Sequence, residues 1–393
     1  MNVMLCLLSD QPIPNLLSVH HLKPDRLILI ESEEMQKKKT ADHFLQALQF
    51  GGLDYAQRAE IHPLDLVDDL EAVRQCLRKA YGSHSTANWI ANLTGGTKPM
   101  SIAAYEFFKA VGARLLYVNA TRPDEMLRLD GSQPEKCSHH LSIAEFLAAY
   151  GFTSTKADDK IAEAEARADR WWSLARIIAE YIPDRDLLSI NREEWATIRE
   201  KGLELKSDHI IDLPSEVKTA LQATFDLAPA GNSLTGKVDK YVGKFLTGEW
   251  LEVFFWKLLQ THAAALAIDS VRLGVEVRQK DNPVPTDFDV AFIRRHALGV
   301  VECKSGAQEQ MDDPNAPLDK LEARSQQFRA LRVNPVLATT STSPKMLDEK
   351  GQLKANIAAR ARLYNSRIVT VYQIQELARS PDSAEKLHRV LFG

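Results

Sequence analysis

Two largely apolar runs on either side of a short polar stretch constrain the fold of this chain more tightly than any other feature. The runs are residues 288–293 and 298–303, and the polar stretch is residues 294–297. This pattern predicts a β-hairpin. With the turn centred between Arg295 and His296, Asp289 and Glu302 are cross-strand partners whose Cβ atoms lie about 5 Å apart. The hairpin would therefore bring two carboxylates together.

The spacing Asp-x12-Glu-x-Lys also places a lysine beside these carboxylates. Side chains alternate along a strand, so Glu302 and Lys304 share one face. Like charges directly opposite one another destabilise a sheet, so Asp289 and Glu302 call for a compensating cation. Because all the donors are oxygens, we expect magnesium or manganese. Such a centre fits phosphodiester hydrolysis, in which the metal activates water and Lys304 offsets charge in the transition state. An ordinary hairpin with this short pattern is the alternative.

A third carboxylate precedes the hairpin. Glu252 lies within the run of large apolar side chains at residues 248–256, on a predicted helix. A buried carboxylate without a partner is costly, so Glu252 either meets a cation or points out of the core. A metal shared with Asp289 and Glu302 would satisfy it.

Length and composition limit the class of protein. A chain of 393 residues suggests two or three domains. The net charge of −4 gives no overall basic field, so a nucleic acid would need a local patch or metal ions. The four cysteines are scattered without C-x-x-C spacing, and no apolar stretch is long enough to cross a bilayer. We expect a cytoplasmic protein with no membrane partner.

The first 150 residues alternate predicted strands and helices. This order predicts a parallel, doubly wound, Rossmann-like sheet. The strands are residues 3–8, 26–31, 88–93 and 114–119, and the helices are residues 13–21, 41–50, 64–81 and 100–111. The loop after the first strand lacks G-x-G-x-x-G, which argues against a dinucleotide site of the usual type.

A second loop in this region is suited to an anion. Thr94-Gly95-Gly96-Thr97-Lys98 follows a predicted strand and opens a helix, where backbone N–H groups and the helix dipole favour phosphate. It is not a Walker A loop, because no hydroxyl residue follows Lys98. A Gly-Gly turn with a threonine N-cap is the structural alternative.

The remaining sequence predicts two further regions. Residues 151–235 read as a helical connector, with helices at 162–182, 192–202 and 214–224 that could form either a winged-helix-like unit or a plain spacer. Residues 236–393 read as a restriction-endonuclease-like α/β core. Besides the hairpin, this core has predicted strands at residues 271–277, 336–339 and 368–372, and a helix at 318–331.

These motifs together resemble the ancillary nucleases of type III CRISPR systems, in which a CARF sensor domain is fused to a restriction-endonuclease-like PD-(D/E)xK domain. At the sensor end the resemblance rests on Ser9, Asp10, Gln11, Pro12 and the loop from Thr94 to Lys98. At the nuclease end it rests on Gly248-x-Trp250-Leu251-Glu252, Asp289 and Glu302-x-Lys304. The sequence departs from the family pattern just before Asp289, where a different pair of residues would be expected. The role of Asp287, which lies at this point, therefore stays open.

The resemblance implies a CARF domain over residues 1–150, the connector over 151–235 and a nuclease domain over 236–393. It further implies a homodimer that encloses cyclic tetra-adenylate on its two-fold axis. The substrate would be single-stranded RNA, single-stranded DNA or supercoiled duplex. Two alternatives remain: a ligand-controlled DNA-binding regulator without nuclease activity, and a ring nuclease in which Lys98 helps to degrade the cyclic ligand.

Overall fold

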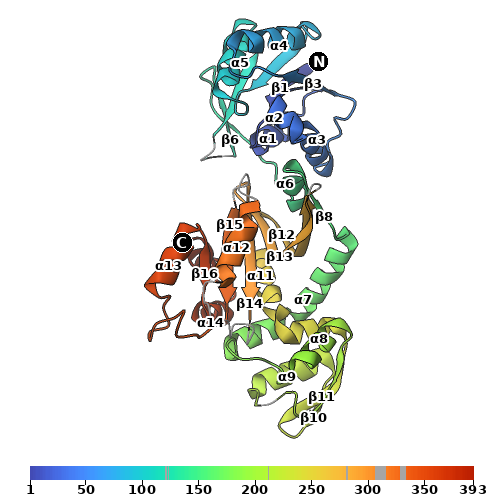
Figure 1. The fold of residues 1–393 in the computed structure, drawn as a ribbon, viewed down its shortest axis with the longest axis vertical. Coiled ribbons are helices and arrows are strands. Elements are labelled where there is room, and N and C mark those ends of the chain that lie inside the picture. Colours follow the sequence, from blue (N-terminus) through green and yellow to red (C-terminus); the bar gives the residue numbers. More distant parts are fainter. Residues whose placement is uncertain (120–121, 123, 211, 280–281, 306–315, 328–332) are drawn as a thin grey trace. The chain divides into compact units, whose positions relative to one another are not determined.

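The computed structural model describes residues 1–393 except 120–121, 123, 211, 280–281, 306–315 and 328–332. The chain divides into two compact units (Figure 1). The N-terminal unit contains Met1–Thr155 together with Val277–Pro285 and Arg295–Leu298. The C-terminal unit contains Lys156–Glu276, Thr286–Arg294 and Gly299–Gly393. No helix in the described ranges is both long and apolar enough to span a membrane.

The N-terminal unit is built on a seven-stranded sheet of order β3-β2-β1-β4-β5-β6-β7. Its first five strands are parallel and the last two are antiparallel. The strands are β1 (Asn2–Leu7), β2 (Arg26–Ser32), β3 (Ala59–Leu64), β4 (Asn88–Asn92), β5 (Arg114–Val118), β6 (Glu125–Arg128) and β7 (Glu135–Lys136). The helices are α1 (Ile13–Leu22), α2 (Glu33–Lys37), α3 (Thr40–Phe50), α4 (Leu70–Gly82), α5 (Lys98–Ala110) and α6 (Ile143–Ala149). The predicted doubly wound architecture is confirmed.

The central strands show why this sheet forms. Residues Val3 to Leu7 and Leu27 to Ile30 are fully buried, as expected for parallel strands covered by helices on both faces. Two details of the prediction were wrong. Strand β3 was not predicted, because it is an edge strand with an exposed face and a proline. The helix predicted from residue 64 starts at Leu70, where Asp69 caps its N-terminus.

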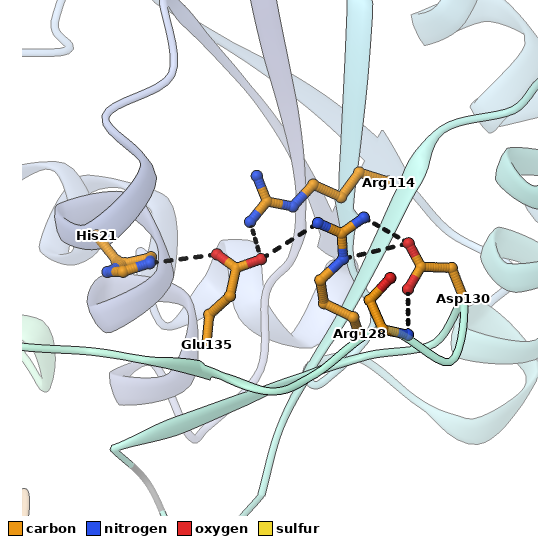
Figure 2. Close-up of polar contacts among 6 residues, drawn as sticks. His21, Arg114, Arg128, Asp130 and Glu135 are labelled. Carbon is orange, nitrogen blue, oxygen red and sulfur yellow. Dashed lines mark hydrogen bonds and ion pairs between the residues drawn. The ribbon is translucent and has the colours of Figure 1, made fainter.

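A network of ion pairs lies near the end of the sheet at which the parallel strands begin (Figure 2). Glu135 on β7 pairs with Arg114, the first residue of β5, and lies 3.5 Å from Arg128 and 3.3 Å from His21 of α1. Arg128 also pairs with Asp130. These contacts hold the β6–β7 hairpin against β5 and α1. Arg114 and Arg128 are therefore both paired with carboxylates. They lie toward the ends at which the parallel strands begin, away from the loops that follow the carboxyl ends of these strands.

Most of a six-stranded sheet of order β16-β15-β14-β13-β12-β8 belongs to the C-terminal unit. Its strands are β12 (Ile268–Gln279), β13 (Asn282–Arg294), β14 (Ala297–Lys304), β15 (Val333–Thr339) and β16 (Arg367–Val369). The end of β12 pairs with β8 (Phe152–Ser154). The helices of this region are α7 (Asp158–Tyr181), α10 (Lys240–Lys244), a π-helical turn η1 (Phe245–Glu249), α11 (Trp250–Thr261), α12 (Ala316–Gln327), α13 (Ala355–Leu363), α14 (Val371–Arg379) and α15 (Ala384–Phe392).

The predicted connector is not purely helical. A three-stranded antiparallel sheet of order β10-β11-β9 accompanies its helices. The elements are α8 (Arg192–Glu200), β9 (Leu203–Leu205), α9 (Ser215–Phe225), β10 (Ala228–Ala230) and β11 (Ser233–Val238). These helices and strands form a small α/β unit, so the connector is more than a plain helical spacer.

Two predicted elements of the last region need comment. The strand predicted over residues 368–372 ends at Val369, because Thr370 caps the following helix α14. The predicted helix at residues 318–331 corresponds to α12, and its last residues lie outside the described ranges. Other expected strands and helices of this region are present.

Candidate active site and anion-binding loop

The register of the β13–β14 hairpin sets the centre of the candidate active site. Arg295 and His296 have φ angles of 49° and 58° and form a two-residue turn. Counting back from this turn makes Asp289 the partner of Glu302, as predicted. The same register pairs Phe292 with Gly299. The Phe292 ring lies close to Gly299, which agrees with this pairing.

Hydrogen bonds hold these carboxylates in place. The backbone N–H of Cys303 donates to Asp289 Oδ2 at 2.7 Å. Lys304 Nζ lies 2.7 Å from Glu302 Oε1, and the Glu302 side chain is 8% exposed. The alternation expected along β14 is therefore realised, with Glu302 and Lys304 on one face. Asp287 is exposed and lies on the same strand as Asp289.

A glycine contact brings helix α11 to this hairpin. Gly248 in η1 has a φ of 136°, which side-chain-bearing residues rarely adopt. Its carbonyl oxygen accepts a hydrogen bond from Ser305 Oγ at 3.1 Å, just beyond the end of β14. Gly248 thus kinks the chain just before α11. Here the turn fixes the start of α11, and thus Glu252, beside the carboxylates of the hairpin.

The electrostatics show that these groups form one cluster. Burial, followed by the negative charges of Asp289 and Glu249, raises the pKa of Glu252 well above its usual value, against smaller opposing effects of Lys304 and Arg199. Excess negative charge of this kind favours a bound cation.

Lys304 keeps its proton in this cluster. Burial alone would lower its pKa, but the carboxylates of Glu302 and Asp289 outweigh that effect and raise it. Lys304 is therefore an ammonium group at neutral pH. In this form it can stabilise negative charge on a phosphoryl group.

Sequence reasoning missed two members of the cluster. Arg199 on α8 donates to Glu249 Oε1 at 3.1 Å and to Thr247 Oγ1 at 2.8 Å. Glu249 could have been found, because it precedes Glu252 by three residues and helical residues at this spacing are neighbours. Nothing in the local sequence pattern pointed to Arg199, because it lies 50 residues from Glu249 in the sequence.

Three carboxylates suit a hard divalent cation, but in this conformation two of them are held by protein donors. Glu302 contacts Lys304, and Asp289 accepts from the Cys303 backbone. The ligand atoms of Glu252, Asp289 and Glu302 do not all lie within 4.8 Å of one another, whereas those of one other group among the described residues do. As a donor set, Glu252, Asp289 and Glu302 fit magnesium or manganese.

The group whose ligand atoms do lie this close together is His20, His139 and Glu145 in the N-terminal unit. The two imidazole rings are stacked, with centroids 3.6 Å apart and planes 3° apart. Their Nε2 atoms lie 3.2 Å and 2.8 Å from the same oxygen of Glu145. Imidazoles that share one metal ion diverge from it, whereas these are parallel. The arrangement is a buried polar cluster that ties α1 to α6.

The glycine loop of the N-terminal unit connects the carboxyl ends of two adjacent strands. A side chain at Gly95 would collide with the carbonyl oxygen of Leu7, the last residue of β1. Asn15 Nδ2 donates to that same carbonyl at 2.9 Å, and Asn92 Nδ2 donates to Asn15 Oδ1 at 2.9 Å. The sequence did not reveal this buried asparagine pair. It fixes the loop at the β1–β4 boundary, where the strand order reverses and ligands bind in open α/β sheets.

The residues of this loop have different roles in the structure. The Thr94 hydroxyl donates to Asn92 Oδ1 at 2.6 Å and accepts from the Val118 N–H at 2.8 Å, so it shapes the loop. Thr97 caps helix α5, and Gly96 has a φ of 74°. Lys98 is exposed at the N-terminus of α5, and within the described part of the chain its side chain has no hydrogen-bond or ion-pair partner. Lys98 is thus available to an anion.

The first loop lies at the carboxyl end of β1, the strand that Gly95 touches. Ser9 Oγ accepts a hydrogen bond from the Gln11 N–H at 3.3 Å, and Pro12 precedes helix α1. Asp10 forms a 2.7 Å ion pair with Lys38, just after α2. Lys38 was not identified from the sequence, although it belongs to a run of three lysines. Its pairing places a second cation at this edge of the sheet.

Comparisons with known proteins match both ends of the chain. A model of the Card1 CARF domain matches residues 3–146, and a model of the Card1-like endonuclease domain matches residues 239–364. The chain belongs to the Card1-like CARF nucleases. Its C-terminal region is therefore an endonuclease domain. No curated protein sequence matches the chain.

Solved structures show the same fold. Can2 from Sulfobacillus thermosulfidooxidans, solved in complex with cyclic tetra-adenylate, is 18% identical with a TM-score of 0.67, and the match covers 100% of both chains. Protein VC1899 from Vibrio cholerae is 15% identical with a TM-score of 0.72 over 96% of each chain. A type III CRISPR defence DNA nuclease activated by cyclic oligoadenylate is 18% identical with a TM-score of 0.51, over 86% of this chain and 45% of that one. At these identities the likeness concerns the fold.

Proposed function

We propose that this protein is a nuclease of type III CRISPR defence that cyclic tetra-adenylate switches on and that requires manganese or magnesium. The observation that carries the proposal is the cluster of Glu252, Asp289, Glu302 and Lys304 within an endonuclease domain, in a chain that also has a CARF domain. The substrate would be single-stranded RNA or DNA, or a supercoiled duplex that is nicked, and the setting would be the cytoplasm.

In this proposal Glu252, Asp289 and Glu302 hold the divalent cation, which when bound supplies an activated water and polarises the phosphoryl group. The Cys303 backbone N–H orients Asp289 through its 2.7 Å hydrogen bond. Lys304 remains protonated and stabilises the charge that develops on the phosphoryl oxygens. Arg199 offsets the charge of Glu249, which keeps the excess negative charge on the three metal-binding groups.

The cyclic ligand would bind at the carboxyl edge of the N-terminal sheet. Lys98, the backbone of Gly95 and Gly96, and the N-terminus of α5 would contact phosphate, while the loop from Ser9 to Pro12 would line the other side. A ligand with two-fold symmetry matches an isologous dimer, so we propose a homodimer with the ligand on its axis. The corresponding domain limits are 1–150, 151–235 and 236–393.

The small α/β unit from α8 to β11 favours one second candidate, a ligand-controlled regulator that binds DNA through this unit. A single experiment separates the candidates. Purified protein is incubated with fluorescent RNA and DNA, with and without cyclic tetra-adenylate and manganese, and the cyclic ligand is assayed for breakdown. Cleavage that needs both additions supports the proposal. DNA binding without cleavage supports the regulator, and loss of the cyclic ligand supports a ring nuclease.

The matched control for this experiment is Glu302→Gln, which preserves the shape of the side chain and removes its charge. We expect this variant to bind the cyclic ligand normally and to cleave nothing. Cleavage by the variant at the wild-type rate would overturn the assignment of the centre.

A further inference from the structure

A cavity beside β16 reaches the same edge of the six-stranded sheet as the catalytic cluster. Lys304, the last residue of β14, accepts a backbone hydrogen bond from Thr340 just after β15, at 3.0 Å. Strands β15 and β16 are parallel, with Ala338 opposite Val369. The three strands therefore end at one edge, in the order β14, β15, β16. At about 4.8 Å between neighbours, the end of β16 lies roughly 10 Å from Lys304.

The cavity has a volume of about 660 Å³. It runs along β16 from Ser366 to Thr370, and its other walls are the start of α14, part of α13 and the loop at residues 350–353 between β15 and α13. A second hollow of about 320 Å³ shares Arg362, Ser366 and Arg367 with the first. The second hollow lies beside the starts of β15 and β16, and we refer to the two adjoining hollows as the groove.

The charged side chains that line this groove are all basic. Among the described lining residues, Lys350, Arg362 and Arg367 border the larger cavity, and no aspartate or glutamate lines either hollow. Arg367 is committed to the carbonyl oxygens of Arg389 and Val390. Lys350 and Arg362 are exposed, and in the described ranges their side chains have no ion-pair partner. In a chain of net charge −4, this is a local site for a polyanion.

An aromatic side chain lies in the same wall. Tyr372 is 52% exposed, near the start of α14. Its ring packs against the backbone of Gly351, where an added Cβ would lie 2.7 Å from Tyr372 Cδ2. One part of the ring is thus supported by the loop while the rest faces solvent. A positively charged groove with an exposed aromatic ring is the usual means of holding a single strand, since the backbone contacts cations and a base stacks on the ring.

We propose that this groove holds the single-stranded part of a nucleic-acid substrate, with phosphates at Lys350 and Arg362 and an unpaired base on Tyr372. The inference rests on the proposed nuclease function and adds a position for the strand about two sheet strands away from the catalytic cluster. These three side chains position the substrate and take no part in the chemistry. A duplex would present no free base to Tyr372, so the site favours single strands.

The test measures binding and cleavage separately in the full-length protein. Binding of labelled oligo-U and oligo-dT is followed by fluorescence anisotropy in a Glu302→Gln background at several salt concentrations. Removing two phosphate contacts with Lys350→Ala and Arg362→Ala should lower the slope of log affinity against log salt by about 1.4. Tyr372→Ala should weaken binding roughly tenfold, and Tyr372→Phe should restore it.

The control is Lys354→Ala, because Lys354 is an exposed lysine nearby that does not line the groove. We expect it to bind like the parent protein. An unchanged salt slope and affinity in the groove variants on both oligonucleotides would overturn the proposal, as would an equal loss in the Lys354 control or equally tight binding of a duplex. The charge variants change only exposed side chains, so they test the site even if Tyr372→Ala disturbs the fold.

Cleavage distinguishes failure of the groove from failure of the catalytic centre. These assays use proteins that retain Glu302, with cyclic tetra-adenylate and manganese present. The groove variants should raise the KM for single strands. They should leave hydrolysis of bis(p-nitrophenyl) phosphate unchanged, because this diester is too small to span from the catalytic cluster to the groove. Normal oligonucleotide affinity and a normal KM in the groove variants would refute the role of the groove, but not that of the catalytic centre. A wild-type protein that hydrolyses neither substrate would refute the proposed function, while the anisotropy result would still decide whether the groove binds a strand.

Discussion

The contact between Gly248 and Ser305 predicts a specific coupling between two substitutions. Gly248→Ala would force a side-chain-bearing residue to a φ of 136°, and its Cβ would lie 2.5 Å from Ser305 Oγ. The backbone strain costs about 1–3 kcal/mol. The clash can be relieved only if the serine hydroxyl rotates away and gives up its 3.1 Å hydrogen bond to the Gly248 carbonyl, a loss of about 1 kcal/mol.

Ser305→Ala alone should therefore cost about 1 kcal/mol, and Gly248→Ala alone about 2–4 kcal/mol. In the double variant the hydroxyl is absent, and the Ser305 Cβ at 3.9 Å from the new Cβ is an ordinary contact. The same hydrogen bond is then lost once instead of twice. The double variant should be about 1 kcal/mol more stable than the sum of the single changes implies.

Denaturant unfolding of the four proteins measures this coupling. A matched control is Gly231→Ala, because Gly231 also has a positive φ of 61° but has nothing within 4 Å of an added Cβ. It should show backbone strain without coupling to Ser305. Additive effects of Gly248→Ala and Ser305→Ala would refute the view that Ser305 fixes the turn. Since this turn positions Glu252, we also expect Gly248→Ala to cleave more slowly than Gly231→Ala.

Four further outcomes are expected. Glu302→Gln or Asp289→Asn should abolish cleavage and change cyclic tetra-adenylate affinity by no more than a few-fold, which titration calorimetry and a cleavage assay can check together. Lys304→Ala should lower turnover by about 10²–10³ yet retain manganese binding, because the ammonium stabilises charge and is not a ligand; loss of calorimetric manganese binding would contradict that role. Lys98→Ala should shift activation to higher cyclic-ligand concentration, with cleavage recovered at saturation, and an unshifted activation curve would count against the sensor loop. For Glu145, burial would raise the pKa, but hydrogen bonds from His139, His20 and Ser142 outweigh it and hold the pKa well below the usual 4.5. This carboxylate therefore adds stability above pH 4.5 that is lost as the pH falls further; Glu145→Gln should be less stable at pH 7 and approach the wild type in acid, and a constant difference in melting temperature would refute the assignment.

The sequence by itself determined the features that depend on local pattern. The alternation of side chains and a two-residue turn were enough to pair Asp289 with Glu302 and to place Lys304 beside them, because a strand has a fixed period and a turn of known length fixes its register. Likewise the glycine loop before Lys98 and the alternation of strands and helices were sufficient to predict a doubly wound sheet with an anion-binding loop.

Only the tertiary structure decided the contacts between segments far apart in the chain. Ser305 reaches Gly248 across 57 residues and Arg199 reaches Glu249 across 50, and nothing in either local pattern encodes these pairs. The pairing of Asp10 with Lys38 is of the same kind. Local competition also mattered, since Thr370 begins a helix inside a run that reads as a strand.

The groove beside Tyr372 shows the limit most clearly. Lys350, Arg362 and Tyr372 belong to a loop and two different helices, with no shared period in the sequence. They become neighbours because the loop after β15, helix α13 and the start of α14 all lie beside β16, the outermost strand of the sheet. Local propensity determines which elements form, but the packing of those elements decides which side chains meet at a site.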